Sequence, residues 1–286
     1  MKIGSICSGY GGLDMAVEYV FQAETIWMSD IDKSASISIK ENWNLPNLGD
    51  IKTVNWDDIE PIDILTAGYP CQPFSNAGQR KGVKDERHIW PYINQIISKL
   101  RPKYVILENV KGHLSLGFKE VLKDLTNNGY DSKWSIIRAS DIGAPHRRER
   151  LFVIAKPTNT NSIGFDFREL RTQGSQRQPQ LEFASSAEII SNTKHIDWSH
   201  DWQTPQMGRR FATRFEMSMR RTPNPLDNGK VNLEFVEYMM GLPEGWVTNL
   251  PISRAQKYKL LSNGVIPQQA ELALNTLLKM PSDLVF

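Results

Sequence analysis

At residues 65–75 the chain reads Leu-Thr-Ala-Gly-Tyr-Pro-Cys-Gln-Pro-Phe-Ser. The apolar run from Ile62 to Ala67, interrupted by Asp63, predicts a buried strand. Gly68 and two prolines then stop regular structure, so Cys71 is displayed on a stiff turn at the strand's carboxyl end. Ligands bind at that edge in open α/β sheets. The stretch predicts an α/β fold with Cys71 as a candidate nucleophile, the alternative being a buried structural cysteine.

Composition places the chain among soluble globular proteins. Its 286 residues are 40% hydrophobic and 23% charged, enough for one large domain and a smaller one. The net charge of +2 names no partner, so a polyanion would need a local basic surface. The only cysteines, Cys7 and Cys71, provide neither a disulfide framework nor a metal site, which suits a reducing cytoplasm. No secretory or membrane-spanning run is present, so we expect an intracellular protein. We also expect no bound metal.

A glycine turn follows the first predicted strand. Residues 2–7 read as a strand, residues 8–13 as the turn Ser-Gly-Tyr-Gly-Gly-Leu, and residues 14–21 as an amphipathic helix. In this context bare backbone can approach a ligand at a helix N-terminus. The spacing Gly-x-Gly-Gly departs from the dinucleotide motif, so a pyrophosphate is not implied. A plain tight turn is the alternative.

Acidic residues follow at the ends of later segments. Asp30 comes after the predicted strand 24–29 and is placed to accept hydrogen bonds from ribose hydroxyls, with Asp32 as a competitor. Ile31 can lie against an adenine face, and Asp50 sits in a further predicted loop. A glycine turn with two acids favours an adenosine cofactor that lacks phosphates, and S-adenosylmethionine fits this description.

Polar residues also mark the later strands of this half. Glu108 directly follows the apolar strand 104–107, where a carboxyl group can act as a general acid with a raised pKa. Arg148 and Arg150 are two residues apart, so on an extended chain both point to one face, where they suit an anion or a carbonyl oxygen. An ordinary strand-end residue and a solvated basic run are the alternatives. We also predict helices over 33–43, 89–100, 118–127 and 266–280, and a strand pair from 130–139 and 151–155.

The pattern changes after Pro157. Residues 159–191 are polar with little periodicity, which indicates a smaller irregular domain. Residues 207–221 then carry five arginines against one acid, with aromatic residues nearby, which is typical of a surface for phosphates and base edges. A charged helix face is the alternative.

Together these motifs resemble the cytosine-C5 DNA methyltransferase family of bacterial and phage type. The resemblance is carried, in the family's order, by Ser8–Gly12, Pro70–Ser75, Glu108–Val110, Arg148–Arg150 and Ser262–Pro267. It implies a Rossmann-like S-adenosylmethionine-dependent methyltransferase domain over residues 1–156, a target-recognition domain over 157–250, and a segment 251–286 that returns to the first domain. The implied activity is methyl transfer to C5 of cytosine in a specific sequence of double-stranded DNA, with the base flipped out.

The resemblance also implies residue roles. Cys71 would be the covalent nucleophile at C6, Glu108 would hold N3 and the exocyclic amine, and Arg148 and Arg150 would contact the base carbonyl and orient Glu108. The implied cofactor residues are Ser8, Gly9, Tyr10, Gly11, Gly12, Leu13, Asp30, Ile31, Asp50, Ile51, Pro70, Asn263 and Val265. The expected DNA contacts are Gln72, Ser75, Arg80, Arg209, Arg210 and Arg214.

Two positions depart from the family pattern. Ile31 stands where many relatives have an aromatic residue, which weakens adenine stacking, and Ser262 stands where relatives usually have glycine, which restricts that turn. We expect a monomer, and a companion restriction endonuclease acting on the same site is a possible partner. The target sequence is not readable from the chain.

Particular residues disfavour three rival interpretations. A transfer RNA substrate, as in one branch of the family, is disfavoured by Ser75 and by the lack of a third cysteine. A DNA-binding protein with an inactive methyltransferase fold is disfavoured by the presence of Cys71. A nicotinamide oxidoreductase would leave Cys71, Glu108 and Arg148 unexplained.

Overall fold

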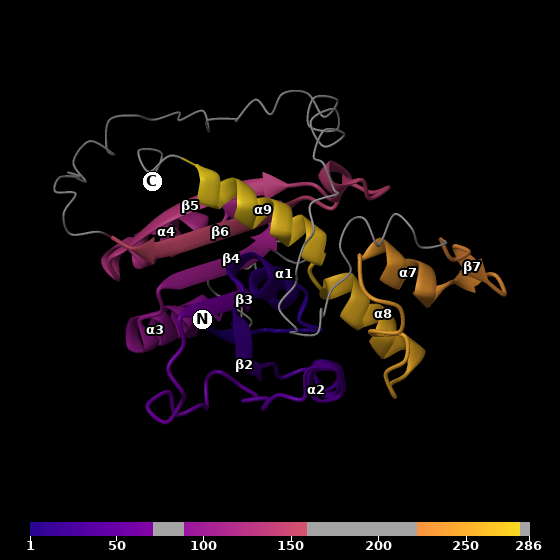
Figure 1. Cartoon of the computed structure of the whole chain (residues 1–286), viewed down its shortest axis with the longest axis horizontal. Helices are drawn as coiled ribbons and strands as arrows, with labels where there is room; N and C mark the ends of the chain where they lie inside the picture. The colour runs from indigo at the N-terminus through magenta and orange to yellow at the C-terminus, as the bar shows by residue number, and fades with distance from the viewer. Residues whose placement is uncertain (71–88, 159–221, 281–286) are drawn as a thin grey trace. The chain divides into compact units, whose positions relative to one another are not determined.

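A six-stranded sheet forms the centre of the computed structural model, which describes residues 1–70, 89–158 and 222–280 (Figure 1). The strand order is β2-β1-β3-β4-β6-β5. The strands are β1 Lys2–Ile6, β2 Glu24–Ser29, β3 Ile64–Gly68, β4 Tyr104–Val110, β5 Tyr130–Ile137 and β6 Arg150–Pro157. The helices are α1 Gly12–Phe21, α2 Lys33–Ser38, α3 Trp90–Leu100, α4 Phe118–Asn127, α7 Leu233–Met239, α8 Arg254–Asn263 and α9 Pro267–Lys279. A small hairpin pairs β7 Leu226–Asp227 with β8 Lys230–Val231.

Strand direction brings several chain segments to one edge of the sheet. Strands β2, β1, β3 and β4 are parallel, so their carboxyl ends share that edge. Strand β6 runs antiparallel to β4, so it begins where β4 ends, with Arg150 opposite Val110. The chain leaves β1 towards β2 on one side and reaches β3 on the other. This change of direction is where α/β sheets bind ligands.

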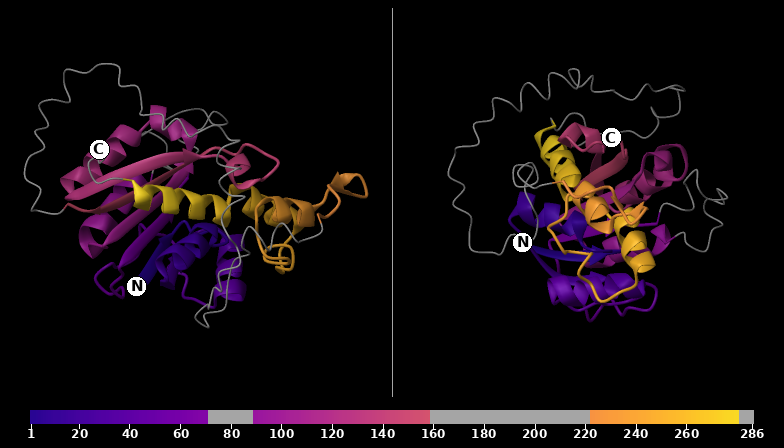
Figure 2. Two further views of the ribbon diagram at one scale, coloured as in Figure 1. Left: turned by 45° about the horizontal axis from the view of Figure 1, so that its top comes forward. Right: turned by 90° about the vertical axis from the view of Figure 1, so that its right-hand side faces the viewer.

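Alternation along the strands creates two separate cores. Neighbouring residues such as Ile64 and Leu65 point to opposite faces, because side chains alternate along an extended chain. Leu65 lies in the core with the apolar residues of α3 and α4. Ile64 lies in the core with those of α1 and α9. The sheet is therefore covered by helices on both faces (Figure 2).

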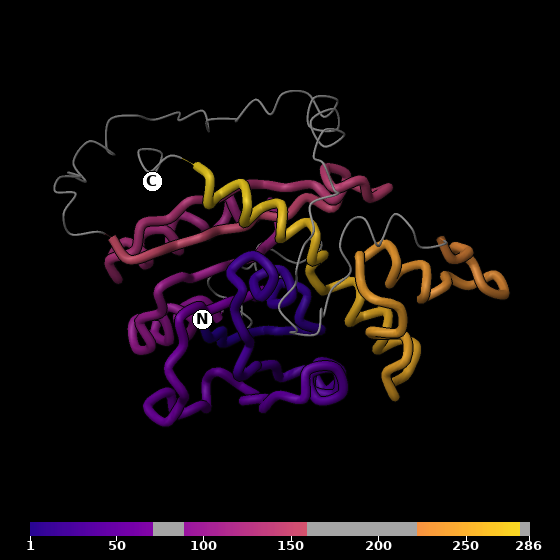
Figure 3. The backbone as a smooth tube through the Cα atoms, in the orientation of Figure 1, coloured from indigo at the N-terminus to yellow at the C-terminus, as the bar shows by residue number. Residues whose placement is uncertain are grey.

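Helix α9 returns the C-terminal part of the chain to the first strands. It begins at Pro267, a residue that suits the first helical position. Its buried positions Ala270, Ala273, Leu274 and Leu277 follow helical spacing and pack against α1, β5 and β6. Helix α9 thus lies against α1, although the two helices are far apart in the sequence (Figure 3).

The structure confirms the predicted α/β class, and most predicted elements appear close to their expected bounds. Strand β4 is longer than predicted, because Glu108 to Val110 continue the pairing with β6. Residues 254–263 form a helix that we did not predict, started by a capping box between Ser253 and Gln256. The predicted helix over 33–43 is divided: α2 ends at Ser38, and Ile39–Trp43 follow directly as a π-helix.

By its contacts the chain divides into two compact units, Met1–Pro157 with Arg210–Phe286, and Thr158–Arg209. Most of the predicted recognition domain lies outside the described residues. Within the described ranges, no helix has the length and apolar character needed to cross a membrane.

A buried carboxyl group, Asp14, connects α1 to the sheet. The hydroxyl of Ser5 donates to its Oδ2 at 2.9 Å, and the hydroxyl of Thr66 donates to its Oδ1 at 2.5 Å. Burial raises the pKa of Asp14 to about 6, although both hydroxyls lower it. Because the pKa is raised, the stability from this group is complete below pH 3.8 and is lost as the pH rises through about 6.

We therefore expect Asp14→Asn to raise the thermal midpoint more at pH 8 than at pH 5. The upper limit of the gain is about 3 kcal/mol, at 1.36 kcal/mol per pKa unit. Thermal unfolding at both pH values measures it. Asp32→Asn is the matched control, because the pKa of Asp32 is lowered and its effect should be equal at both pH values. An equal shift at both pH values for Asp14→Asn would contradict the assignment.

Candidate active site and cofactor turn

A buried ion pair stands at the shared edge of the sheet. Arg150, at the start of β6, donates from Nε to Oε1 of Glu108 on β4 at 3.0 Å. Only 9% of the Glu108 side chain and 18% of the Arg150 side chain are exposed. Gly68, the last residue of β3, lies opposite Glu108 in the register. The pair therefore adjoins the strand end from which Tyr69 and Pro70 lead to Cys71.

The second oxygen of Glu108 lies towards β3. A Cβ atom built on Gly68 would be 3.7 Å from Glu108 Oε2, an ordinary contact distance. Burial raises the pKa of Glu108, and the charges of Arg150 and Arg148 lower it only partly. The carboxyl group thus holds its proton to a higher pH than an exposed glutamate. Such a group can donate a hydrogen bond as well as accept one.

Arg148 binds two backbone carbonyls of the segment before α9. Its Nη2 donates to the carbonyl of Ser262 at 3.0 Å and to that of Gly264 at 2.6 Å. Its φ of 29° is not extended, so the alternation assumed for Arg148 and Arg150 does not apply. Arg150 forms the ion pair with Glu108, while Arg148 joins the sheet edge to the segment before α9.

A second polar network, which the sequence analysis did not find, holds the residues before Cys71. Asn109 donates from Nδ2 to the carbonyl of Tyr69 at 3.4 Å. His113 donates from Nδ1 to the carbonyl of Leu116 at 2.8 Å, so its Nε2 accepts from the hydroxyl of Tyr69 at 2.7 Å. Asn109 follows Glu108 in the sequence, which was a usable signal, whereas a lone histidine such as His113 gives none.

Several predicted residues lie outside the described ranges. These are Cys71, Gln72, Ser75, Arg80, Arg209, Arg210 and Arg214. Pro70, the residue before Cys71, is described and half-buried.

The glycine turn and the end of β2 are bound to each other. Gly9 N–H donates to Asp30 Oδ2 at 2.9 Å, and Asp32 N–H donates to Asp30 Oδ1 at 2.8 Å. Burial raises the pKa of Asp30. Ser8 also binds the end of β2, because its hydroxyl accepts from the N–H of Ser29 at 3.3 Å.

Of the two competing acids, Asp30 is the one that adjoins the turn. The side chain of Asp32 instead caps α2, accepting from the N–H groups of Ser34 and Ala35. Its Oδ2 also pairs with Lys259 at 2.6 Å.

The glycines of the turn serve different purposes. Gly9 has a φ of 57°, and a Cβ built there meets nothing within 4 Å. A Cβ on Gly11 would lie 2.1 Å from the Trp43 ring, and one on Gly12 would lie 2.1 Å from the carbonyl oxygen of Val265. Gly9 therefore offers open backbone to a ligand, while Gly11 and Gly12 permit close packing.

The remaining predicted cofactor residues are partly internal. Tyr10 is fully buried and Leu13 is 4% exposed, so both side chains belong to the core and only their backbone is available to a ligand. Ile51 is 7% exposed. Ile31, next to Asp30, is 74% exposed and presents an apolar side chain to solvent.

Three predicted cofactor residues remain: Asn263 and Val265 from the C-terminal part of the chain, and Asp50 from a turn. Val265 reaches the glycine turn, because its carbonyl oxygen accepts from the Tyr10 hydroxyl at 2.7 Å, while Asn263 is exposed. The carboxylate of Asp50 accepts from Lys52 N–H at 3.0 Å within its own turn. An open glycine, a carboxylate and an exposed apolar side chain at one strand end fit an adenosine-type cofactor.

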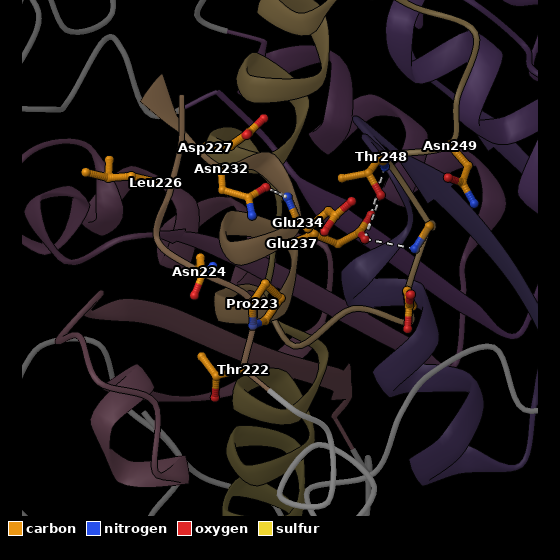
Figure 4. A pocket seen from close by; sticks show the side chains of 12 residues that line it. Thr222, Pro223, Asn224, Leu226, Asp227, Asn232, Glu234, Glu237, Thr248 and Asn249 are labelled. Carbon is orange, nitrogen blue, oxygen red and sulfur yellow. Dashed lines mark hydrogen bonds between the residues drawn. The ribbon is translucent and has the colours of Figure 1, made fainter. Parts of the chain in front are cut away.

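A separate cavity of about 860 Å³ lies around α7 (Figure 4). Its lining includes Thr222, Asn232, Glu234, Glu237, Thr248 and Asn249. It shares no residue with the Glu108–Arg150 pair or with the glycine turn, so we do not assign the chemistry to it.

Known proteins resemble this chain over most of its length. A family described as C-5 cytosine-specific DNA methylase matches residues 1–228. The Type II methyltransferase M.BsuFI of Bacillus subtilis is 28% identical over 286 residues, covering 90% of this chain and 68% of the relative. M.Bsp6I of Bacillus sp. (strain RFL6) is 35% identical over 176 residues, covering 58% of this chain. The alignment covers 56% of M.Bsp6I, so this chain spans about half the length of that relative.

Solved structures show the same fold at low identity. The Dnmt2 methyltransferase of S. pombe has a TM-score of 0.62 at 18% identity, covering 98% of both chains. A putative DNA modification methyltransferase from an E. coli prophage has a TM-score of 0.60 at 17% identity, covering 98% of this chain and 100% of that one. The fold therefore agrees with the family match, which extends over more than half of the sequence. The chain belongs to the C-5 cytosine-specific DNA methylase family.

Proposed function

We propose that this protein transfers a methyl group from S-adenosylmethionine to C5 of a cytosine in a specific sequence of double-stranded DNA. The observation that carries the proposal is the buried Glu108–Arg150 pair beside the strand end that leads to Cys71. Family membership supports the reaction class. S-adenosylmethionine supplies an electrophilic methyl group on a sulfonium.

The proposed chemistry explains why a thiol is needed. C5 of cytosine is a weak nucleophile, and a thiolate at Cys71 strengthens it by adding to C6. As the sulfur–C6 bond forms, the electrons of the C5–C6 double bond move to C5 and the ring. C5 then takes the methyl group as the bond from that group to the sulfonium sulfur breaks, and S-adenosylhomocysteine leaves with the electron pair. The C5 proton passes to a base, and the bond from the Cys71 sulfur to C6 breaks to restore the double bond and the thiolate.

Glu108 is proposed to stabilise the ring during this addition. Its raised pKa makes protonation easier than for an exposed glutamate, and once protonated the carboxyl group can donate to N3 while its other oxygen accepts from the exocyclic amine. Arg150 holds Oε1 of this carboxyl group and keeps Glu108 in place. We propose that Arg150 contacts the base carbonyl, and that Arg148 orients this edge through the carbonyls of Ser262 and Gly264.

The substrate must open for this chemistry, because C5 and C6 are shielded in a stacked duplex, so the base is flipped out. Gln72, Ser75, Arg80, Arg209, Arg210 and Arg214 remain predictions for DNA contact. A domain over residues 157–250 that reads the target, action as a monomer in the cytoplasm, and a companion restriction endonuclease also belong to the proposal. The Type II methyltransferase relatives support the last point.

For the cofactor, we propose that Ser8, Gly9 and Asp30 hold the methionine and ribose parts, and that Ile31 lies against the adenine. The open backbone at Gly9 and its bond to Asp30 support this assignment. The predicted contacts of Asp50, Ile51, Pro70, Asn263 and Val265 belong to the same proposal.

The test of the function is methyl transfer from labelled S-adenosylmethionine, assayed separately with mixed-sequence DNA and with RNA. Base-resolved mapping of 5-methylcytosine in the DNA follows. We expect label in DNA, at cytosines that share one recurrent sequence. Label in RNA alone would move the substrate to RNA. No label in either, with intact cofactor binding, would support an inactive DNA-binding partner instead.

We predict that Cys71→Ser lowers methylation by at least about a thousandfold, the scale on which loss of a covalent nucleophile acts. Binding of S-adenosylhomocysteine, measured by calorimetry, should survive because the cofactor residues lie elsewhere. Cys7→Ser is the matched control and should retain methylation. Near-normal methylation by Cys71→Ser would exclude the nucleophile assignment.

Glu108→Gln tests the protonated carboxyl group. Activity that needs the acid form falls as the pH rises through the raised pKa of Glu108, while formation of the Cys71 thiolate increases with pH. The wild type should therefore show a bell-shaped profile of single-turnover rates. The glutamine amide donates at every pH, so the variant should lose the alkaline decline. It cannot transfer a proton as the acid does, so its rate should be about 10²-fold lower.

The control for this profile is Glu149→Gln. Glu149 is paired with Lys111 and Arg138 at the surface, so its loss should leave the shape of the profile unchanged. An unchanged alkaline decline in Glu108→Gln would show that another group causes it.

A further inference from the structure

Two tryptophan side chains bind the same carbonyl group of the glycine turn. Trp43 Nε1 and Trp246 Nε1 each donate to the carbonyl oxygen of Tyr10 at 3.1 Å. Their rings meet edge to face, with centroids 6.1 Å apart and planes at 86°. Trp43 ends the helical stretch after β2, whereas Trp246 comes from the loop after α7, 236 residues from Tyr10. The turn is therefore held by a distant part of the chain.

The loop that carries Trp246 is built around one buried carboxylate. Glu237 on α7 is 1% exposed and accepts from the N–H groups of Gly245, Val247 and Thr248 and from the Thr248 hydroxyl, at 2.6–2.9 Å. The contacts of Glu237 with Thr248 appear beside the α7 cavity in Figure 4. Asn42 also donates to the carbonyl of Trp246 at 2.8 Å. The indole is thus presented by a loop that is fixed on both sides.

Tyr10 is fixed at its other end too. Its hydroxyl donates to the Val265 carbonyl, and a Cβ on Gly264 would lie 1.9 Å from its ring. With the ring and the carbonyl both held, the backbone of Tyr10 has little freedom. Gly9, the open glycine, is the neighbouring residue and donates to Asp30. The orientation of Gly9 therefore depends on the contacts of Tyr10.

We infer that Trp246 is a positioning residue for the cofactor turn. Its N–H fixes the Tyr10 carbonyl and so presents Gly9 and Asp30 in a shape ready to bind. The inference rests on the proposed function, because it places the cofactor at this turn. Cofactor binding and local order are linked. Loosening Trp246 therefore lowers the affinity for the cofactor, and the bound cofactor in turn stabilises the Trp246 loop.

The test is Trp246→Phe, which keeps an aromatic ring and removes the indole N–H. We expect calorimetry on the full chain to show S-adenosylhomocysteine binding about three- to tenfold more weakly, the fold-change of one lost hydrogen bond. The KM for S-adenosylmethionine should rise by a similar factor, with kcat at saturating cofactor unchanged. A role in general stability alone would not separate KM from kcat in this way.

Trp27→Phe is the matched control, because its indole donates to the Glu60 carbonyl at 3.4 Å, away from the turn, and cofactor affinity should not change. If Trp246→Phe does not fold, Asn42→Ala loosens the same loop from outside and should raise the dissociation constant in the same direction. Wild-type affinity in these variants would overturn the inference. A wild-type protein that binds no S-adenosylhomocysteine would instead overturn the proposed cofactor itself.

Discussion

The ion pair between Glu108 and Arg150 requires the arrangement of strands that this sheet has. Glu108 lies near the carboxyl end of the parallel strand β4, and Arg150 begins β6, which runs the other way. The two side chains meet only because an antiparallel strand is inserted next to β4. Removing one partner of such a buried pair costs about 3–5 kcal/mol, because the other charge is left without compensation. The same pair replaced by apolar residues can be equally stable, so its presence indicates chemistry more than stability.

The glycine turn depends on residues from distant parts of the sequence. Gly12 allows the Val265 backbone to approach, Gly264 makes room for the Tyr10 ring, and Arg148 binds the carbonyl of Gly264. Helix α9 then packs on α1 and fixes this arrangement. The segment after residue 221 therefore supports the glycine turn as well as the core.

Local patterns predicted the six strands of the central sheet, most helices and the position of Glu108, because apolar runs and strand ends are written in neighbouring residues. They did not predict the partners of Arg148, since Ser262 is 114 residues away and only the packed fold brings it near. The distinction between Gly9 and Gly11 was also out of reach, because it depends on the Trp43 ring. Asn109 and Trp246 donate to backbone carbonyls, and His113 binds the Leu116 carbonyl and the Tyr69 hydroxyl, so residue type alone does not name these partners.

The central claim is that Cys71 forms a covalent bond to cytosine beside Glu108. The most direct measurement uses duplex DNA with 5-fluorocytosine at the mapped target, in the presence of S-adenosylmethionine. Fluorine at C5 cannot leave as a cation, so the sulfur–C6 bond cannot be broken after methyl transfer. We predict a stable protein–DNA adduct whose mass includes one methyl group and whose linkage maps to the peptide containing Cys71. A protein that methylates the ordinary target but forms no adduct with the fluorinated one, or an adduct at another residue, would contradict the account.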